Sequence, residues 1–135
     1  MLADHVVLAL PTADRVRAHA FWGAGGLGLE TPGPLADDGV PEPLQVVLNP
    51  GLTVMLVPTG GFGWTAAGRA VAEPGVVECQ LSISLDSPAA VDAFVERARA
   101  AGAEVAAEPT GQPWGYTATL ADPDGHLLMA LAPSG

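Results

Sequence analysis

Apolar and polar positions follow the same succession of elements in the two halves of the chain. In the first half, an apolar run at residues 6–10 precedes a helical stretch that Thr12 can cap and that reaches about Trp22. Three glycines then end the helix, at Gly23, Gly25 and Gly26. Short strands are expected at 27–30, 44–48 and 52–57, the last two joined by the turn Asn49-Pro50-Gly51. The predicted order is β-α-β-β-β.

The second half repeats this order. In residues 76–85 apolar and polar side chains alternate in part, as is typical of a half-buried strand. Ser87 and Pro88 supply an N-cap and a first-turn proline, and a single helical stripe holds Val91, Phe94, Val95 and Ala98. Gly102 stops that helix. Strands then follow at 104–107, 116–121 and 127–132, and the last two flank Asp122-Pro123-Asp124-Gly125, which has the residue types of a tight hairpin turn.

A constant offset of 75 residues relates the two halves, matching His5 to Gln80, Leu10 to Leu85, Val54 to Met129 and Pro58 to Pro133. The repeat predicts an α+β protein built from two tandem β-α-β-β-β modules, at residues 1–58 and 75–135. Residues 59–74 are rich in glycine and show no hydrophobic period, so they are expected to be the linker between the modules.

The net charge limits the classes of binding partner that we expect, and the cysteine content indicates the cellular compartment. The net charge is −10 and all five cations are arginines, so nucleic acids and anionic membranes are poor partners, while a cationic or neutral ligand is acceptable. Cys79 is the only cysteine, is expected in the core, and indicates a reducing compartment. The apolar run at 6–10 is too short for a signal peptide, and nothing reaches membrane-spanning length. We expect a cytoplasmic protein.

The closing hairpin, YTATLADPDGHLLMALAP at 116–133, resembles the last strands of the vicinal oxygen chelate superfamily. That superfamily includes glyoxalases, extradiol dioxygenases and bleomycin-resistance proteins. The 75-residue repeat and Phe21-Trp22 at the end of the first helix extend the resemblance over nearly the whole chain. The resemblance implies that the two modules form curved mixed sheets around a cleft, and that the protein is a homodimer.

Members of the superfamily that use a metal place its ligands at positions that correspond here to His5, Val54, Gln80 and Met129. His5 can ligate and Gln80 is a weak neutral oxygen donor, whereas Val54 has no donor. Met129 offers a thioether in place of the usual glutamate, and hard divalent ions disfavour thioethers. A catalytic metal needs about three protein ligands plus an open position. We therefore expect no metal and no cofactor, with His5 and Gln80 as weak candidates. His5 can also be a hydrogen-bonded remnant or a ligand contact.

Four aromatic residues lie in or beside Gly/Pro-rich loops: Phe62, Trp64, Trp114 and Tyr116. Such rings either cover the core, fill a dimer interface, or stack on a flat apolar ligand. With the missing carboxylate, the pattern resembles the metal-free, antibiotic-binding branch of the superfamily. The scarcity of Lys, Ile and Asn beside abundant Ala, Gly, Val and Pro indicates a GC-rich bacterial genome.

These observations predict a non-enzymatic protein that sequesters an aromatic antibiotic or natural product, as drug self-resistance proteins do. The predicted ligand-binding residues are His5, Phe62, Trp64, Gln80, Trp114, Tyr116 and Met129. The alternative is an enzyme of the same fold, either a metal-dependent lyase, isomerase or dioxygenase or a cofactor-free biosynthetic catalyst. His5 and Gln80 support that alternative, so the sequence leaves open whether the chain is an enzyme.

Overall fold

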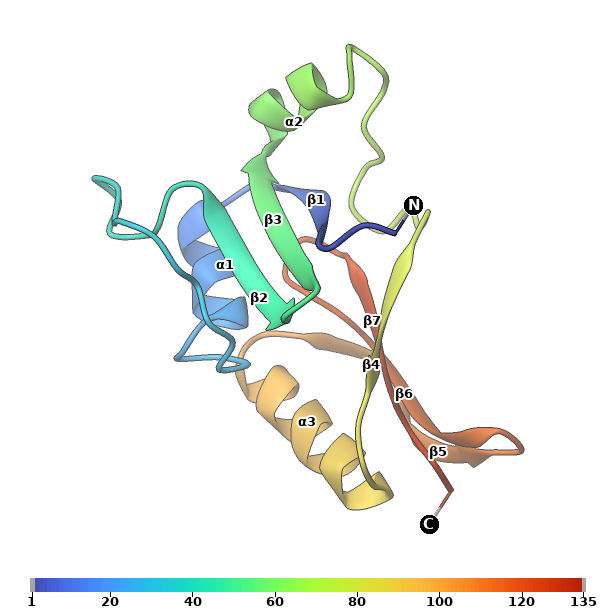
Figure 1. Ribbon diagram of the computed structural model, residues 1–135. Helices are drawn as coiled ribbons and strands as arrows, with labels where there is room; N and C mark the ends of the chain where they lie inside the picture. The colour runs from blue at the N-terminus through green and yellow to red at the C-terminus, as the bar shows by residue number, and fades with distance from the viewer. Residues whose placement is uncertain (1, 135) are drawn as a thin grey trace. The chain divides into compact units, whose positions relative to one another are not determined.

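The computed structural model describes residues 2–134 and shows two compact units that divide between Ala72 and Glu73 (Figure 1). The first unit contains β1 (Val6–Thr12), α1 (Arg15–Trp22), β2 (Leu44–Asn49), β3 (Leu52–Pro58) and α2 (Thr59–Thr65). The second contains β4 (Gln80–Ser84), α3 (Pro88–Ala100), β5 (Glu104–Gln112), β6 (Gly115–Ala121) and β7 (Leu127–Ala132). The predicted α+β class is confirmed, because residues 2–134 form two mixed sheets of three and four strands combined with three helices. Over residues 2–134, every helix is too short or too polar to cross a membrane.

The first unit packs α1 against one face of a sheet with the strand order β1-β3-β2. β3 is parallel to β1 and antiparallel to β2. The sheet contributes to the core Leu10, Leu44, Val46, Val54 and Leu56, and α1 contributes Ala18, Phe21 and Trp22. The rings of Phe21 and Trp22 meet edge to face with their centroids 5.5 Å apart. This face of the sheet is therefore the buried one.

The start of α1 differs from the prediction. β1 continues through Thr12, and the helix is capped by Asp14, whose Oδ1 accepts a hydrogen bond of 3.0 Å from the backbone N–H of Arg17. The Thr12 hydroxyl instead bonds to the backbone of Asp14. The strand expected at residues 27–30 is also wrong, since only a single bridge from Glu30 to Val47 forms there.

Arg15 holds the long segment 31–43 against the start of α1. Its Nε donates to Oδ2 of Asp38 at 3.1 Å, and its Nη2 donates to the carbonyl oxygens of Val40 and Pro41 at 3.2 and 2.9 Å. The hydrogen bond from Arg15 holds the pKa of the Asp38 carboxyl below its usual value. One side chain thus orders a segment that has almost no regular structure of its own.

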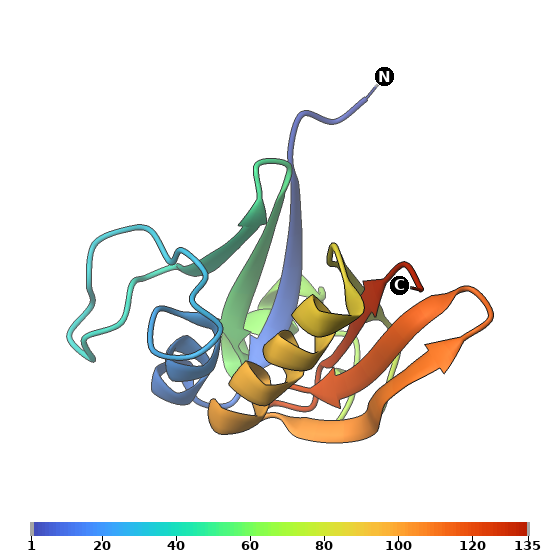
Figure 2. The ribbon, with the colours of Figure 1, turned by 90° about the horizontal axis from the view of Figure 1, so that it is seen from below.

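The second unit is a four-stranded sheet in the order β4-β7-β6-β5, with β4 parallel to β7 and the other pairs antiparallel. Figure 2 shows α3 lying along one face of this sheet. The predicted cap is confirmed, because Oγ of Ser87 accepts a hydrogen bond from the backbone N–H of Ala90 at 3.1 Å. The core combines Val91, Val95 and Ala98 of α3 with Ala118, Leu120, Leu128, Ala130 and Ala132 of the sheet.

The predicted hairpin between β6 and β7 is also confirmed. Oδ1 of Asp122 accepts hydrogen bonds from the backbone N–H groups of Asp124 and His126, at 3.0 and 2.8 Å. Gly125 has φ +88°, a conformation that favours glycine. The turn residues identified in the sequence therefore make the hydrogen bonds and adopt the backbone conformation that form the hairpin turn.

Three features of the chain differ from the expected organisation. Residues Thr59–Thr65, expected to lie in a linker without structure, form α2. β5 runs to Gln112 rather than ending at 107, with irregular pairing to β6 between Val105 and Thr110. Cys79 is exposed just before β4, so its expected place in the core is wrong.

Candidate ligand-binding faces

The first sheet has one face turned away from α1, and the second sheet has one face turned away from α3. In the second unit Tyr116 shows which face that is. Its phenol donates a hydrogen bond of 2.8 Å to Oδ1 of Asp92 on α3. Since side chains alternate along a strand, the other β6 residues on the α3 side are Ala118 and Leu120. The opposite side, which we call the open face of the second sheet, carries Thr117, Thr119 and Ala121.

Pairing across the strands arranges this open face in rows. The first row is Gln80, Leu127, Ala121 and Glu104; the second is Ser82, Met129 and Thr119; the third is Ser84, Leu131 and Thr117. Half-buried apolar side chains of β7 thus lie between serines of β4 and threonines of β6. Gln80 and Met129, both predicted to bind the ligand, share this face.

The open face of the second sheet offers apolar contact with hydroxyl groups at its sides. Leu127, Met129 and Leu131 supply the apolar contact, and neighbouring hydroxyls can donate or accept hydrogen bonds. Among the residues of these three rows, only Glu104 has a charged side chain. It lies at the opposite end of the first row from Gln80. This arrangement suits a flat, mostly apolar molecule with a few polar groups.

In the first unit, the open face carries Val7 and Ala9 of β1 beside Thr53 and Met55 of β3. His5 belongs to the same face, because its Nε2 lies 2.9 Å from Oγ1 of Thr53. Its Nδ1 lies 3.2 Å from the carbonyl oxygen of Pro50. Both ring nitrogens of His5 are thus engaged with the protein itself.

Val54 is not the counterpart of Met129 in three dimensions. Leu8 pairs with Val54, 46 positions later, whereas Ser82 pairs with Met129, 47 positions later. Because a shift of one residue turns a side chain to the other face, Val54 lies with Leu8 on the α1 side and is 0% exposed. The 75-residue offset matches Val7 to Ser82, and Ser82 pairs with Met129. The counterpart of Met129 by strand pairing is therefore Thr53, which pairs with Val7.

The residues at the superfamily's ligand positions therefore do not fit a catalytic metal. His5 is occupied by Pro50 and Thr53, and Val54 is in the core. On the second sheet, Gln80 and Met129 belong to different rows and offer one amide oxygen and one thioether. This donor set lacks the carboxylates and imidazoles that divalent ions need.

A group of potential metal ligands lies elsewhere, in the turn between β6 and β7. One donor atom each of Asp122, Asp124 and His126 lies within 4.8 Å of the others. Oδ1 of Asp122 already accepts two backbone hydrogen bonds that form the turn. We assign this cluster to the stability of the hairpin.

The predicted aromatic residues fall in three different settings. Trp64 on α2 is 83% exposed, while Phe62 on the same helix is half-buried. Trp114 lies between β5 and β6 and is 68% exposed. Tyr116 lies on the α3 side, and the hydrogen bond to Asp92 raises the pKa of its phenol. The predicted ligand role of Tyr116 stays a prediction, and its position beside α3 favours a structural role.

α2 lies next to the open face of the first sheet. A Cβ atom placed on Gly61 would lie 3.4 Å from Cγ1 of Val57, which shares that face with Thr53 and Met55. The helix that carries Phe62 and Trp64 therefore packs against this face near the end of β3. His5 lies on the same face beside Thr53, near the start of β3. The glycine-rich sequence gave no periodic signal for this helix.

The family model that matches the chain is that of the glyoxalase/bleomycin resistance protein/dioxygenase superfamily, over residues 4–130. No curated protein matches the chain. The solved structures named below resemble it over almost its full length with less than 25% identity, which shows the fold alone.

Three structures illustrate the range. A hypothetical protein, SA1046 from S. aureus, has a TM-score of 0.79 and 23% identity over 98% of this chain and 95% of its own. A glyoxalase-related enzyme from Fulvimarina pelagi has a TM-score of 0.80 and 22% identity over 97% and 88%. TnmS3, an antibiotic binding protein from Streptomyces sp. CB03234, has a TM-score of 0.67 and 24% identity over 98% and 97%.

Proposed function

Because the chain belongs to the glyoxalase/bleomycin resistance protein/dioxygenase superfamily, we propose that it binds a small aromatic antibiotic or natural product and sequesters it without turnover. The observation that carries this proposal is the open face of the second sheet, where Met129 stands in an apolar stripe between hydroxyl-bearing strands. The fold shared with the antibiotic binding protein TnmS3 supports the same class of ligand.

In this proposal Gln80 and Met129 contact the ligand on the open face of the second sheet. The ligand-binding role of His5, in the first unit, stays a prediction. The exposed ring of Trp114, in the second unit, stacks on the ligand. The ligand-binding roles of Phe62 and Trp64, on α2 of the first unit, stay predictions. Methionine suits this position, since its polarisable sulfur packs well against aromatic rings. Large exposed rings such as those of Trp64 and Trp114 are typical of surfaces that bind a partner or ligand.

The proposal is tested by calorimetric titration with a panel of flat aromatic natural products that includes anthraquinones, enediynes and mitomycin-like compounds. We expect a bound member of the panel to lose about 1–3 kcal/mol of binding free energy in Trp114→Ala. The matched control is Leu35→Ala, which removes another exposed apolar side chain, 69% exposed in the first unit and outside the predicted site. Absence of binding across the panel, or turnover of any member, would contradict sequestration.

We also propose that the protein is a homodimer. The sheets end in β1 and β2 in the first unit and in β4 and β5 in the second, and proteins commonly cover such edges by association. Sedimentation velocity at micromolar concentration is expected to show one species of twice the chain mass. A monomer under those conditions would contradict this part of the proposal.

An enzyme of the same fold is the second candidate, favoured by the likeness to the glyoxalase-related enzyme from Fulvimarina pelagi. Metal analysis of protein purified without chelators separates the metal-dependent form from the binder. Stoichiometric metal that is lost in His5→Ala would favour the enzyme, whereas a cofactor-free catalyst would be found by a substrate screen.

A further inference from the structure

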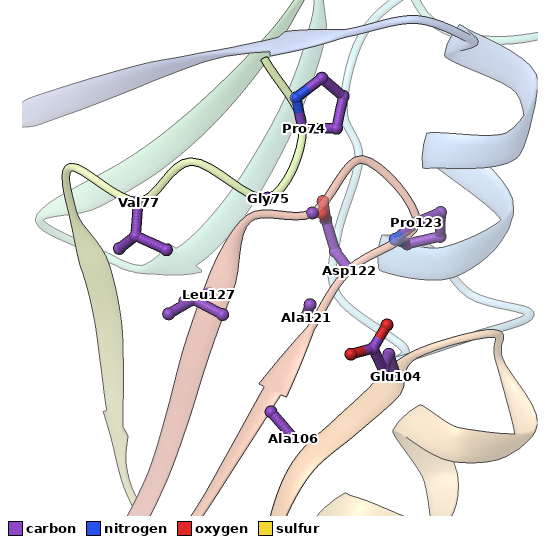
Figure 3. Close-up of a pocket in the computed structure, with 10 residues that line it drawn as sticks. Pro74, Gly75, Val77, Glu104, Ala106, Ala121, Asp122, Pro123 and Leu127 are labelled. Carbon is purple, nitrogen blue, oxygen red and sulfur yellow. The ribbon is translucent and has the colours of Figure 1, made fainter. Parts of the chain in front are cut away.

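A pocket of about 360 Å³ lies entirely within the second unit, where the turn after β6 meets the segment that precedes β4 (Figure 3). Ala121 and Leu127 line it from the first row of the open face, and Val77 lines it from the preceding segment. Ala106, in the irregular part of β5, lines it as well. The volume falls within the range of small-molecule pockets.

The wall of this pocket is built by a close backbone contact. A Cβ atom on Gly125 would lie 3.1 Å from the backbone nitrogen of Gly75, so the turn and the segment touch directly. Both glycines have positive φ, +88° and +92°. The residue types at these two positions therefore hold Pro74 and Val77 in place beside the hairpin.

The pocket is negatively charged, because the ionisable side chains that line it are Glu104 and Asp122. Asp122 is 4% exposed and its Oδ1 accepts two backbone hydrogen bonds. Glu104 is exposed, and among residues 2–134 its carboxylate has no ion pair or hydrogen bond. By contrast, Glu108 on the same strand is paired with Arg99 at 2.8 Å.

The unit around the pocket strengthens this negative potential. Of the chain's fifteen acidic residues, nine fall between residues 73 and 135, together with two of the five arginines. Arg99 already pairs with Glu96 and Glu108. An excess of carboxylates around a partly apolar pocket raises the local concentration of cations and disfavours anions.

We propose that this pocket binds a small organic ammonium ion, with its apolar body against Val77, Ala121 and Leu127 and its charged group beside Glu104. The pocket adjoins the open face and shares Glu104, Ala121 and Leu127 with its first row, but it includes none of the seven residues predicted to bind the aromatic ligand, so the two proposals can be tested separately. A neutral molecule of the same shape gains only the apolar contact and binds more weakly. An anion is excluded by Glu104 and Asp122.

The test compares benzylammonium with benzyl alcohol, which has nearly the same shape and no charge, by NMR titration of the full chain at millimolar concentration. We expect benzylammonium to shift the backbone amides of Ala106, Ala121, Gly125 and Leu127, and to bind about three- to fivefold more tightly than the alcohol. The preference should shrink as salt is added, because an exposed charge pair is screened.

Two variants with matched controls locate the effect. Glu104→Gln is expected to remove the preference for benzylammonium, while Glu108→Gln, which deletes the same charge on the same strand, keeps it. Ala106→Leu should fill the pocket and abolish binding of both probes, whereas Ala107→Leu should not. Trp114→Ala should leave benzylammonium binding unchanged, which separates this site from the one proposed for the aromatic ligand. Equal binding of the two probes, or an unchanged preference in Glu104→Gln, would overturn the proposal.

Discussion

The phenol of Tyr116 donates a hydrogen bond to Asp92 across the interface between β6 and α3, and this contact defines the two faces of the second sheet. Tyr116 and Met129 lie on adjacent strands but on opposite faces, since Tyr116 pairs with Ala132 and Met129 with Thr119. One face thus packs against the helix, and the other is the open face on which the proposed ligand site lies.

Because Tyr116 is the only tyrosine, its titration can be followed alone by the ultraviolet absorbance of tyrosinate. The hydrogen bond to Asp92 raises the pKa of the phenol above the ordinary value of 10.0. The contribution of the bond to stability is therefore complete below pH 10.0 and is lost as the pH rises through the raised pKa of the folded protein. Asp92→Asn should shift the absorbance transition to lower pH, and an unchanged transition would show that the bond does not form in solution.

The difference between Val54 and Met129 can be tested by placing an acid at each. Val54→Asp puts a carboxylate in the core of the first unit and should cost at least about 3 kcal/mol of unfolding free energy. Met129→Glu should leave the protein folded, because Met129 is half-buried on the open face, but should weaken binding of the aromatic ligand. Chemical denaturation measures the first effect and calorimetry the second. Equal destabilisation by the two acids would contradict the face assignment.

Removing the carboxylate that Arg15 binds should loosen the segment 31–43. Asp38→Asn is expected to speed amide hydrogen exchange at Gly39 and Val40, with Asp37→Asn as the neighbouring control. Since the pKa of Asp38 is lowered from the ordinary value of 3.8, its contribution to stability is present above that pH and is lost as the pH falls through the lowered pKa. Exchange rates that do not distinguish the two variants would show that the ion pair between Arg15 and Asp38 is not needed to order the segment.

Two neighbouring glycines after α1 should differ sharply in their tolerance of alanine. A Cβ atom on Gly26 would collide with the backbone oxygens of Phe21 and Ala20, whereas one on Gly25 would meet nothing within 4 Å. Gly26→Ala should therefore lower the thermal midpoint by several degrees, since about 1–3 kcal/mol of strain enters a small unit. Gly25→Ala should leave the midpoint nearly unchanged, and similar midpoints for the two variants would refute the close approach.

The sequence predicted the elements whose signals are local. Ser87 and Pro88 begin a helix by capping chemistry alone, and the Asp122–Gly125 turn fixes its hairpin. α2 gave no such signal, because three of its seven residues are glycine and no side chain caps it; its contacts are with β1 and β3. Those tertiary contacts were not visible in the sequence.

The strand positions of the candidate site residues were predicted only in part for a related reason. The repeat placed Gln80 and Met129 correctly on one sheet, but it also matched Val54 to Met129. The register of a parallel pair is set by packing over more than forty intervening residues. The register of β3 against β1 differs by one residue from the register of β7 against β4. Hydrophobicity does not reveal this difference at Val54 and Met129, since both residues are apolar.

The place of β7 in its sheet has a consequence for the order in which the second unit is made. β7 follows the other three strands of this unit in the chain, yet it lies between β4 and β6 and is the hydrogen-bonded neighbour of both. Until residues 127–132 have left the ribosome, β4 lacks its partner strand, and α3 lacks the apolar surface of Leu128 and Ala130. The sheet of this unit is therefore incomplete without β7, so the pocket beside Glu104 and the face around Met129 both depend on this one strand.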